Sequence, residues 1–427
     1  SFDKGVAYIS ATRYKLNDYA SYAYKTTDYG KTWTKINKGV KSDDFIKVIR
    51  EDTKNKNILY AGSERGFYLS TDAGSSWQPF QLNLPIVPVT DLMIRDNDLV
   101  AATAGRAFWI LDDLGAIQQA TTASAVTLFT PKPAYKFGGG TGLPEAKYKA
   151  GQNAPEGVIL DYILPEVTDS TLVTLTITDA SGKLIRTYSN KKDAAYVKYP
   201  GGPAAATLLS AKKGHNRFLW NLRNENILPD VKNVFVYGSY EGYAVPPGKY
   251  KAQLNFNGTI SETEMMVLAN PAISATAADW NEQQQILASI TASISEMHQQ
   301  VNELRKIRKQ LIHHSDILKG VKPAEKVLDE AKKLIEVIDA WESNIVEGRI
   351  QNGQDVINWP SKLNVEFFNI KRLADAADPR ITQGIKTRLA DLQSQWNAEK
   401  GKVEAIKKSV AAYNTLYKSQ QLEALIF

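Results

Sequence analysis

The stretch Thr26-Thr27-Asp28-Tyr29-Gly30-Lys31-Thr32-Trp33 recurs, position by position, as Ser70-Thr71-Asp72-Ala73-Gly74-Ser75-Ser76-Trp77. The aspartates of the two copies lie 44 residues apart. A weaker third copy follows 41 residues after Asp72, with Asp113 and Gly115 in the segment LDDLGAI. A repeat of this length indicates the blades of a propeller, each of which holds about four strands.

Each type of residue in the repeat has a role in a tight turn between two strands. The aspartate can accept hydrogen bonds from turn amides, and the hydroxyl residues can close the same local network. Glycine supplies a positive φ at low cost, and tryptophan supplies apolar area that pins the hairpin onto neighbouring strands. We therefore assign a structural role in the fold to Thr26, Asp28, Gly30, Thr32, Trp33, Ser70, Asp72, Gly74, Ser76, Trp77, Asp113 and Gly115.

The residues around the repeat are strand-like from position 1 to position 120. About nine short runs rich in β-branched and aromatic residues follow one another there, separated by turn residues and without a helical pattern between them. These runs predict antiparallel sheets. Two or three blades cannot close a ring, so we expect an incomplete propeller whose open strand edges recruit partners.

The repeat has the pattern S/T-x-D-x-G-x-S/T-W and resembles the Asp-box, also called the bacterial neuraminidase repeat. Residues 1–120 therefore resemble blades of sialidase-like or sortilin-type propellers. In such families the boxes lie at the periphery of the blades, away from the central pocket, which implies a role in folding rather than in chemistry. Sialidases draw their arginine triad and catalytic Tyr, Glu and Asp from blades around the whole ring, and no spacing here singles out such a set.

A proline- and glycine-rich linker is predicted over 121–154, and strand signals return over 155–272. The dipeptide Ser181-Gly182 is typical of a hairpin turn, and the alternation Tyr250, Ala252, Leu254, Phe256 predicts one buried strand face. Six or seven strands in about 120 residues predict an immunoglobulin-like sandwich.

The segment GHNRFLWNLR at 214–223, followed by Pro247-Gly248-Lys249-Tyr250, resembles the sandwich that follows the propeller in large bacterial Asp-box proteins of the "glycosyl hydrolase" type. It is also similar to the Ig-like module of flagellar hook-capping proteins. With the blades before it and helices after it, the order of regions resembles the C-terminal portion of such Asp-box proteins. This implies that the chain is a fragment of a longer secreted precursor.

Residues 275–427 have the apolar period of helices. Three long stripes run over 287–311, 327–345 and 385–417, with a shorter helix expected near 361–375. Stripes of similar length can cover one another within the chain or face another chain as a coiled coil, and we expect intrachain packing. The predicted fold class is thus a multidomain β + α chain: a partial β-propeller of Asp-box blades, an Ig-like β-sandwich and a C-terminal antiparallel helical bundle.

Composition narrows the functions available to the 427 residues. With 43% apolar and 23% charged residues the chain is globular, and without cysteine it forms no disulfide or thiolate metal site. The net charge of +6 is dispersed, so we expect no nucleic-acid partner, and no apolar run predicts a membrane span. No motif for a phosphate, a nucleotide or zinc occurs, so we expect no cofactor and no metal site. The chain opens without a signal peptide, and we expect the parent protein to be secreted, periplasmic or at the cell surface.

Four residues are candidates for ligand binding. Arg65 or Arg106 would line the propeller axis, and Tyr237 and Tyr240 would stack on sugar rings, although packing is the simpler role for these tyrosines. No catalytic residue is predicted, because the adjacent carboxylates Asp43-Asp44 and Asp112-Asp113 would point to opposite faces of a strand.

Three functions remain open from the sequence. The chain is a structural or interaction segment that binds protein, including further blades of a longer parent chain; or a non-catalytic part of a glycoside hydrolase; or a carbohydrate-binding module with a glycan partner. Whether the parent protein is an enzyme stays open, and if it is one, the resemblance implies a glycoside hydrolase. We further expect the three regions to pack as one body that covers the open edges, with Trp109 near the contact between blades and sandwich, or else a chain that self-associates.

Overall fold

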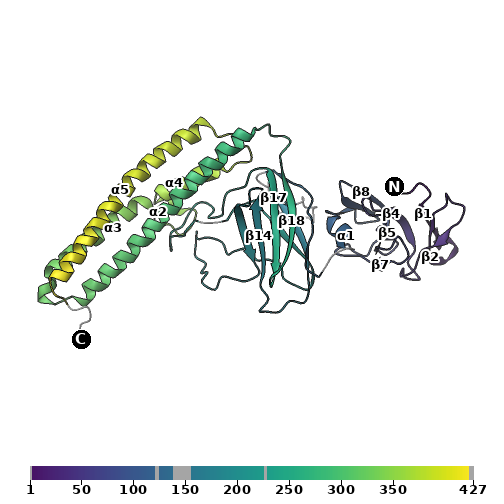
Figure 1. The fold of residues 1–427 in the computed structure, drawn as a ribbon, viewed down its shortest axis with the longest axis horizontal. Coiled ribbons are helices and arrows are strands. Elements are labelled where there is room, and N and C mark those ends of the chain that lie inside the picture. Colours follow the sequence, from purple (N-terminus) through teal and green to yellow (C-terminus); the bar gives the residue numbers. More distant parts are fainter. Residues whose placement is uncertain (1, 121–124, 138–154, 226–227, 423–427) are drawn as a thin grey trace.

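The computed structural model describes residues 2–120, 125–137, 155–225 and 228–422. Three regions follow one another along the molecule, which we call the blade region (2–120), the sandwich (125–269) and the helical unit (277–422) (Figure 1). The blade region and the helical unit lie at opposite ends, with the sandwich between them. Of the expected linker, residues 121–124 and 138–154 lie outside the described residues.

The blade region consists of three small antiparallel sheets, each built from strands that are consecutive in the sequence. The first sheet has β1 (Ala7–Arg13), β2 (Asp18–Thr26) and β3 (Thr34–Lys35). The second has β4 (Ile46–Glu51), β5 (Leu59–Ser63), β6 (Phe67–Ser70) and β7 (Gln78–Pro79). The third has β8 (Val89–Arg95), β9 (Asp98–Thr103) and β10 (Phe108–Leu111).

The three sheets pack face to face in chain order. One cluster of buried side chains, which includes Ala23, Ile36, Leu59 and Trp77, joins the first sheet to the second. Another cluster joins the second sheet to the third. The middle sheet is therefore covered on both faces, whereas the first and third sheets are each covered on one.

The sandwich encloses one core between two sheets. The smaller sheet has the order β11 (Thr127–Leu128), β13 (Val158–Leu164), β16 (Gly214–Trp220). The larger has the order β12 (Ala134–Lys136), β18 (Thr259–Ala269), β17 (Gly248–Phe256), β14 (Val173–Asp179), β15 (Leu184–Ser189). Since β11 and β12 lie within the segment expected to be a linker, that linker is shorter than the sequence predicted. The sequence did not predict these two strands, because they pair with β13 and β18, which are distant in the chain, and so show no local hairpin pattern.

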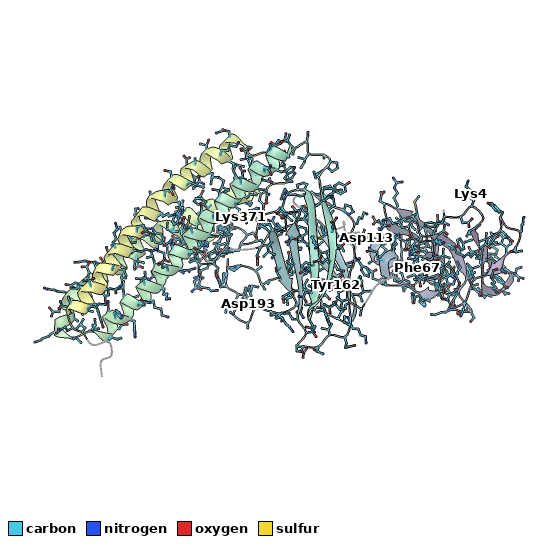
Figure 2. The ribbon with its side chains drawn as sticks, in the orientation of Figure 1. Lys4, Phe67, Asp113, Tyr162, Asp193 and Lys371 are labelled. Carbon is cyan, nitrogen blue, oxygen red and sulfur yellow. The ribbon has the colours of Figure 1, made fainter. Side chains whose placement is uncertain are left out.

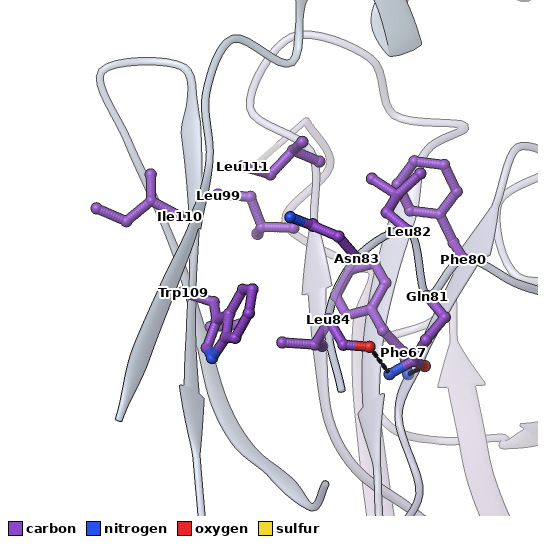
Figure 3. A pocket seen from close by; sticks show the side chains of 11 residues that line it. Phe67, Phe80, Gln81, Leu82, Asn83, Leu84, Leu99, Trp109, Ile110 and Leu111 are labelled. Carbon is purple, nitrogen blue, oxygen red and sulfur yellow. Dashed lines mark hydrogen bonds between the residues drawn. The ribbon is translucent and has the colours of Figure 1, made fainter. Parts of the chain in front are cut away.

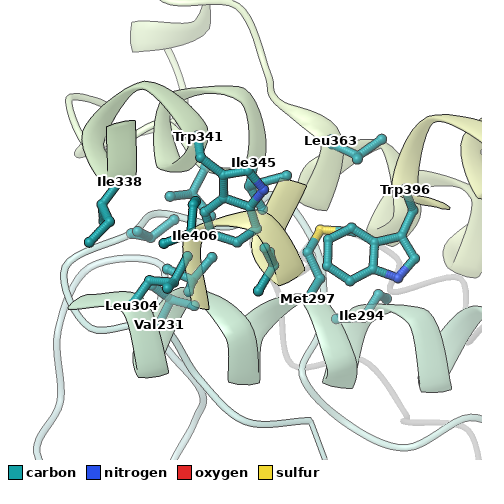
Figure 4. Packing of buried hydrophobic residues seen from close by; sticks show 14 of the residues in the cluster. Val231, Ile294, Met297, Leu304, Ile338, Trp341, Ile345, Leu363, Trp396 and Ile406 are labelled. Atoms are coloured by element: carbon teal, nitrogen blue, oxygen red, sulfur yellow. The ribbon is translucent and has the colours of Figure 1, made fainter. Parts of the chain in front are cut away.

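The helical unit consists of α2 (Ala277–Ile317), α3 (Glu325–Ile345), α4 (Leu363–Ala374) and α5 (Gln383–Ser419). A capping box starts α2, because Thr276 Oγ1 accepts from Asp279 N while the Asp279 carboxylate accepts from Thr276 N. The apolar stripes of the helices share one core, in which Trp396 lies beside Ile294 and Met297 (Figure 4). Among the described residues, none of the helices carries an apolar stretch that would reach across a bilayer.

A loop between β16 and β17 joins the sandwich to the helical unit. Its apolar side chains enter the helical core, and they are Leu228, Val231, Val234, Val236 and Tyr240. Polar contacts close the joint: Arg223 Nη1 lies 2.6 Å from Asp375 Oδ2, and Lys371 Nζ donates to the Glu241 carbonyl at 2.6 Å (Figure 2). The two regions are therefore one packed body.

The contact between the blade region and the sandwich is smaller. It runs through the short helix α1 (Gly115–Ala120) and the strand β11, with Gln119 Nε2 donating to the Thr130 carbonyl at 3.0 Å. The helical unit lies far from the blades and covers neither of their outer faces (Figure 1). The expectation that the sandwich and helices pack onto the blades and cover their open edges was therefore wrong, because the helical stripes pack against one another and against the loop of the joint. The other branch of that expectation, a chain that self-associates, stays a prediction.

Candidate association surface

Strand pairing puts the three sheets of the blade region in one common register. Thr26, the first box residue, pairs with Ala7, and Ser70, the first residue of the second box, pairs with Leu59. The corresponding residue of the third sheet, Leu111, pairs with Leu99. Counting from these pairs, β1, β5 and β9 are equivalent strands, and so are β2, β6 and β10. The first sheet thus corresponds to the last three strands of the second, and the third sheet to its first three.

The first box forms a turn between β2 and β3 around one carboxylate. Asp28 accepts from the main chain of Thr32 at 2.9 Å, from its hydroxyl at 2.7 Å and from the Thr26 hydroxyl at 2.8 Å. The Thr32 amide contributes most to holding the pKa of Asp28 below its usual value. Gly30 has φ +83°, as the turn requires. The indole of Trp33 is 41% exposed and donates only to its own turn, at Gly30 O.

The second box repeats this network between β6 and β7. Asp72 accepts from the Ser76 amide at 2.8 Å, from the Ser76 hydroxyl at 2.6 Å and from the Ser70 hydroxyl at 2.8 Å. Although burial opposes the shift, the bonds from Ser76 hold the pKa of Asp72 below its usual value. Gly74 has φ +90°. Trp77 is 4% exposed, and its Nε1 donates to Ile36 O of the first sheet at 2.7 Å. A box tryptophan is therefore buried by the preceding sheet when one is present.

The third copy does not form a strand-to-strand turn. Asp113 has φ +53° and accepts from Gly115 N at 2.9 Å, and Gly115 begins the helix α1. A further bond comes from Lys132 N at 3.4 Å, across the junction with the sandwich (Figure 2). Asp113 thus ends the third sheet and ties it to the next region.

The outer face of the third sheet is an exposed apolar surface. Met93, Val100 and Ile110 are paired across β8, β9 and β10, and Phe108 pairs with Ala102 beside them. Met93 is 61%, Ile110 60% and Phe108 75% exposed. The common register makes Phe108, Ile110 and Val100 equivalent to second-sheet residues that are all buried against the third sheet, namely Phe67, Leu69 and Tyr60.

The outer face of the first sheet also carries residues whose equivalents in the second sheet are buried, in this case against the first sheet. Ala61 and Tyr68 of the second sheet are buried against the first sheet. Their equivalents in the first sheet are Ile9, which is 46% exposed, and Tyr24. Both outer faces therefore carry side chains at the positions that form sheet-to-sheet contacts inside the blade region. We call the two faces the outer blade faces; each includes an edge strand, β1 or β10.

Trp109 lines a small hollow between the second and third sheets (Figure 3). The indole Nε1 donates to Arg106 O at 3.0 Å, and the ring packs against the core of these two sheets. The hollow measures about 60 Å³, room for a few water molecules only. Trp109 does not line the contact between blades and sandwich, so its predicted place was wrong; it follows Phe108 on a strand that alternates between the two faces.

The two arginines proposed to line the propeller axis lie at hairpin turns, where each contacts a neighbouring group of the blade region. Arg65 lies between β5 and β6, and its Nη1 lies 2.6 Å from Asp43 Oδ2. Arg106 lies between β9 and β10 and donates to Gly105 O at 2.9 Å. Both side chains are exposed and the structure brings no third arginine to either of them among the described residues.

The two tyrosines proposed to stack on sugars lie in the loop of the joint. Tyr240 is 4% exposed and packs between His298 and Phe368. Tyr237 packs edge-on against Phe235, with ring centroids 5.1 Å apart. Neither tyrosine stands on an open platform, and Tyr240 has no ring face available to a sugar.

The buried carboxylates of the blade region serve the fold. Asp44 accepts from Ser63 and Tyr68 hydroxyls, each at 2.9 Å. Asp52 accepts from the Tyr60 hydroxyl at 2.9 Å and from Gln118 Nε2 at 2.9 Å. Each has its own set of donors, which is the opposite of two carboxylates facing one substrate. Sequence reasoning missed Asp52 because a lone aspartate at a turn has no distinguishing pattern.

Comparison with known proteins bears on the blade region. The Sortilin-Vps10 family model, described as Sortilin, neurotensin receptor 3, matches residues 21–107. No curated protein matches the chain.

Several solved structures have detectable similarity to this chain. One is the extracellular domain of a protein from B. thetaiotaomicron described as a one component system. It is 12% identical to this chain over 58% of this chain and 28% of its own, with a TM-score of 0.18. An ancestral GH74 enzyme is 12% identical over 62% of this chain and 34% of that one, with a TM-score of 0.22. The chain spans about a third of the length of these structures, and similarities this low carry no argument about activity. The family match covers the three sheets of the blade region in part and supports a propeller-type fold for residues 21–107.

Proposed function

We propose that this chain is the C-terminal association segment of a sortilin-like Asp-box propeller protein, and that it acts without a catalytic site of its own. Its outer blade faces bind further blade-type sheets, while the sandwich, of immunoglobulin-like type, and an antiparallel bundle of helices form the platform that carries them. The observation that carries this proposal is the exposure of Phe108 and Ile110, whose equivalents Phe67 and Leu69 are buried by the next sheet.

Two further observations support a sheet as the partner. Trp33 is open where its equivalent Trp77 is buried by a preceding sheet. Among the strands that the structure describes, β1 and β10 are each paired along one edge only, and a free edge accepts another strand through main-chain hydrogen bonds. An apolar face beside a free strand edge fits another blade better than it fits a soluble sugar. We extend the proposal to a secreted, periplasmic or cell-surface protein.

The test uses a second copy of the chain as the available blade-type partner. Light scattering after size exclusion should show the mass rising towards a dimer as the concentration increases, and the double variant Phe108→Lys/Ile110→Lys should stay monomeric. The control Ile260→Lys/Ile357→Lys places the same charges on exposed isoleucines of the sandwich and the helical unit, and should behave as the original chain. The proposal fails if the two double variants associate alike, or if the original chain stays monomeric at every concentration.

The alternative, a non-catalytic part of a glycoside hydrolase or a carbohydrate-binding module, makes a different prediction. It requires the chain to bind oligosaccharide, whereas the burial of Tyr240 and the packing of Tyr237 leave these rings no sugar platform. Calorimetric titration with sialosides should show no heat of binding under our proposal. Binding that survives in the Phe108→Lys/Ile110→Lys variant would favour the alternative.

A further inference from the structure

The outer edge of β15 is open at its centre. β15 is the terminal strand of the larger sheet of the sandwich. At one end the Ser189 carbonyl accepts from Leu209 N at 3.0 Å, and at the other the Ile185 carbonyl accepts from Glu225 N at 2.7 Å. Alternate residues of a strand present their main-chain groups to the same edge. Thr187, midway between them, therefore presents its N–H and C=O to this edge, where no residue of the described chain pairs with them.

A second row of free main-chain groups faces this edge. Residues 204–208 belong to no helix or strand, and within the described chain their main-chain groups make no hydrogen bond. Three of their side chains are small, because residues 204–206 are consecutive alanines. The segment is fixed at both ends, because the Tyr196 hydroxyl donates to Pro203 O at 3.0 Å and Leu209 is buried. Between this segment and β15 lies a groove of about 760 Å³, lined also by Glu225 and Glu241.

One cation in the groove lacks a partner. Arg186 stacks on the ring of Tyr188 at 4.7 Å, and its Nη1 is shielded from solvent with no hydrogen-bond partner among the residues that the structure describes. Two of the three carboxylates that line the groove have other partners: Glu241 lies 3.5 Å from Arg223, and Asp193 accepts from Ala195 N at 2.8 Å. The third is Glu225. A guanidinium nitrogen that is hidden from water and unpaired is costly, and a carboxylate brought in by a ligand would remove that cost.

We propose that this groove binds an extended peptide segment of another protein by strand addition limited to the open centre of the β15 edge at Thr187, with an acidic side chain of the peptide on Arg186. The peptide's main chain pairs with Thr187 on one side and with residues 204–208 on the other. Main-chain pairing supplies the affinity of such strand addition, and a side-chain contact supplies the selectivity. The volume lies within the range of sites that enclose small ligands. This site is separate from the outer blade faces and does not depend on the proposed function.

The test uses the full chain and a fluorescein-labelled heptapeptide of alternating threonine and valine with glutamate at its centre. Fluorescence anisotropy should show saturable binding. Thr187→Pro removes the edge N–H and is tolerated on an edge strand, so it should weaken binding about tenfold or more. Thr187→Ala keeps the N–H and is the matched control, which should bind as the original chain does.

A second experiment tests the contact between Arg186 and the acidic side chain of the peptide. Arg186→Gln should weaken binding of the glutamate peptide about tenfold and leave the weaker binding of the same peptide with central glutamine unchanged. Arg95→Gln, at an exposed arginine of the third sheet, is the control. If Thr187→Pro does not fold by circular dichroism, the Arg186 arm decides alone.

Three results would overturn the proposal. The first is that the glutamate peptide shows no binding up to about 1 mM, which corresponds to a binding free energy weaker than about 4 kcal/mol. The second is that folded Thr187→Pro binds the peptide as tightly as Thr187→Ala does. The third is that light scattering shows the edge pairing with a second copy of the chain, and that Thr187→Pro abolishes this pairing. The last result would assign the groove to self-association instead of peptide capture.

Discussion

Two lysines are buried at the joint between the sandwich and the helical unit. Lys136 is 3% and Lys371 4% exposed. Lys371 donates to main-chain carbonyls of the joint. Lys136 Nζ, by contrast, has no hydrogen-bond partner in the described part of the chain and lies 4.5 Å from the ring centre of Trp280. Burial lowers the pKa of each lysine to about 8; Asp375 opposes the shift, and Arg223 adds to it. Glu156 also opposes it for Lys136, and Glu241 for Lys371.

These lysines should make the joint more stable in mild alkali. Below about pH 8 each lysine is protonated in both states, and between about pH 8 and 10.5 only the unfolded chain keeps the proton, so stability rises with pH. Urea unfolding should show a gain of about 2 kcal/mol per lysine from about pH 7.5 to 9.5. Lys136→Met should be more stable than the original chain at about pH 7.5, and its gain should be smaller. The exposed Lys249→Met is the control, and an unchanged slope in Lys136→Met would contradict the prediction.

The two boxes should differ in their effect on stability. Asp72→Ala leaves the turn that positions the buried Trp77 without its acceptor, so we expect a loss of about 1–3 kcal/mol. Asp28→Ala should lower the melting temperature less, since its turn holds an exposed Trp33. Differential scanning fluorimetry measures both, with the exposed Asp96→Ala as control. Equal shifts for the two box variants would show that the tryptophan does not matter.

Single residues that pair over long distances were beyond prediction from the sequence. Lys371, Lys136 and Arg186 owe their environment to segments far away in the chain, and one sequence holds no record of that contact. A signal was present only for Lys371, because it interrupts the apolar residues of its helix. The box residues were visible because a repeated local turn satisfies its own hydrogen bonds.

At the scale of elements, periodicity carried most of the prediction. In α2, the apolar residues that recur with helical period from Leu287 to Val301 are all buried. The inward face of β17 is confirmed too, with Tyr250, Ala252 and Leu254 buried. The loop of the joint was not predicted, since its apolar residues follow neither period and are buried only by helices that come later in the chain.

The shared core of the helices makes a prediction about α2. Ile294→Ala removes a fully buried side chain, so we expect a loss of about 2–5 kcal/mol in the free energy of unfolding. Val337→Ala, at a half-exposed position of α3, should change it by less than about 0.5 kcal/mol. Chemical unfolding followed by far-ultraviolet circular dichroism gives both values. Similar losses would mean that the stripe of α2 is not packed as described.

At the scale of the whole molecule, the two junctions differ in kind. The sandwich and the helical unit share buried side chains through the loop of the joint, whereas the blade region meets the sandwich mainly through α1 and a few polar bonds. The sequence predicted the order of the regions, but how closely they are joined depends on contacts between distant segments.

Heat should therefore unfold the molecule in two steps. Leu92→Ala in the core of the blade region should lower one calorimetric transition only, and Leu254→Ala in the sandwich should lower the other, with the helical signal moving together with it. A single transition shifted by both variants would show that the blade region is coupled as tightly as the helices are.

The fused sandwich and helices also set a length. The helix α2 has 41 residues, which corresponds to a rod of about 60 Å. Because its middle is anchored by the loop of the joint, where His298 Nδ1 lies 2.7 Å from Pro229 O, this rod cannot swing relative to the sandwich, and its far tip keeps a fixed distance from β15 and from the groove beside it. The turn between α2 and α3 therefore stays at a constant distance from the sandwich.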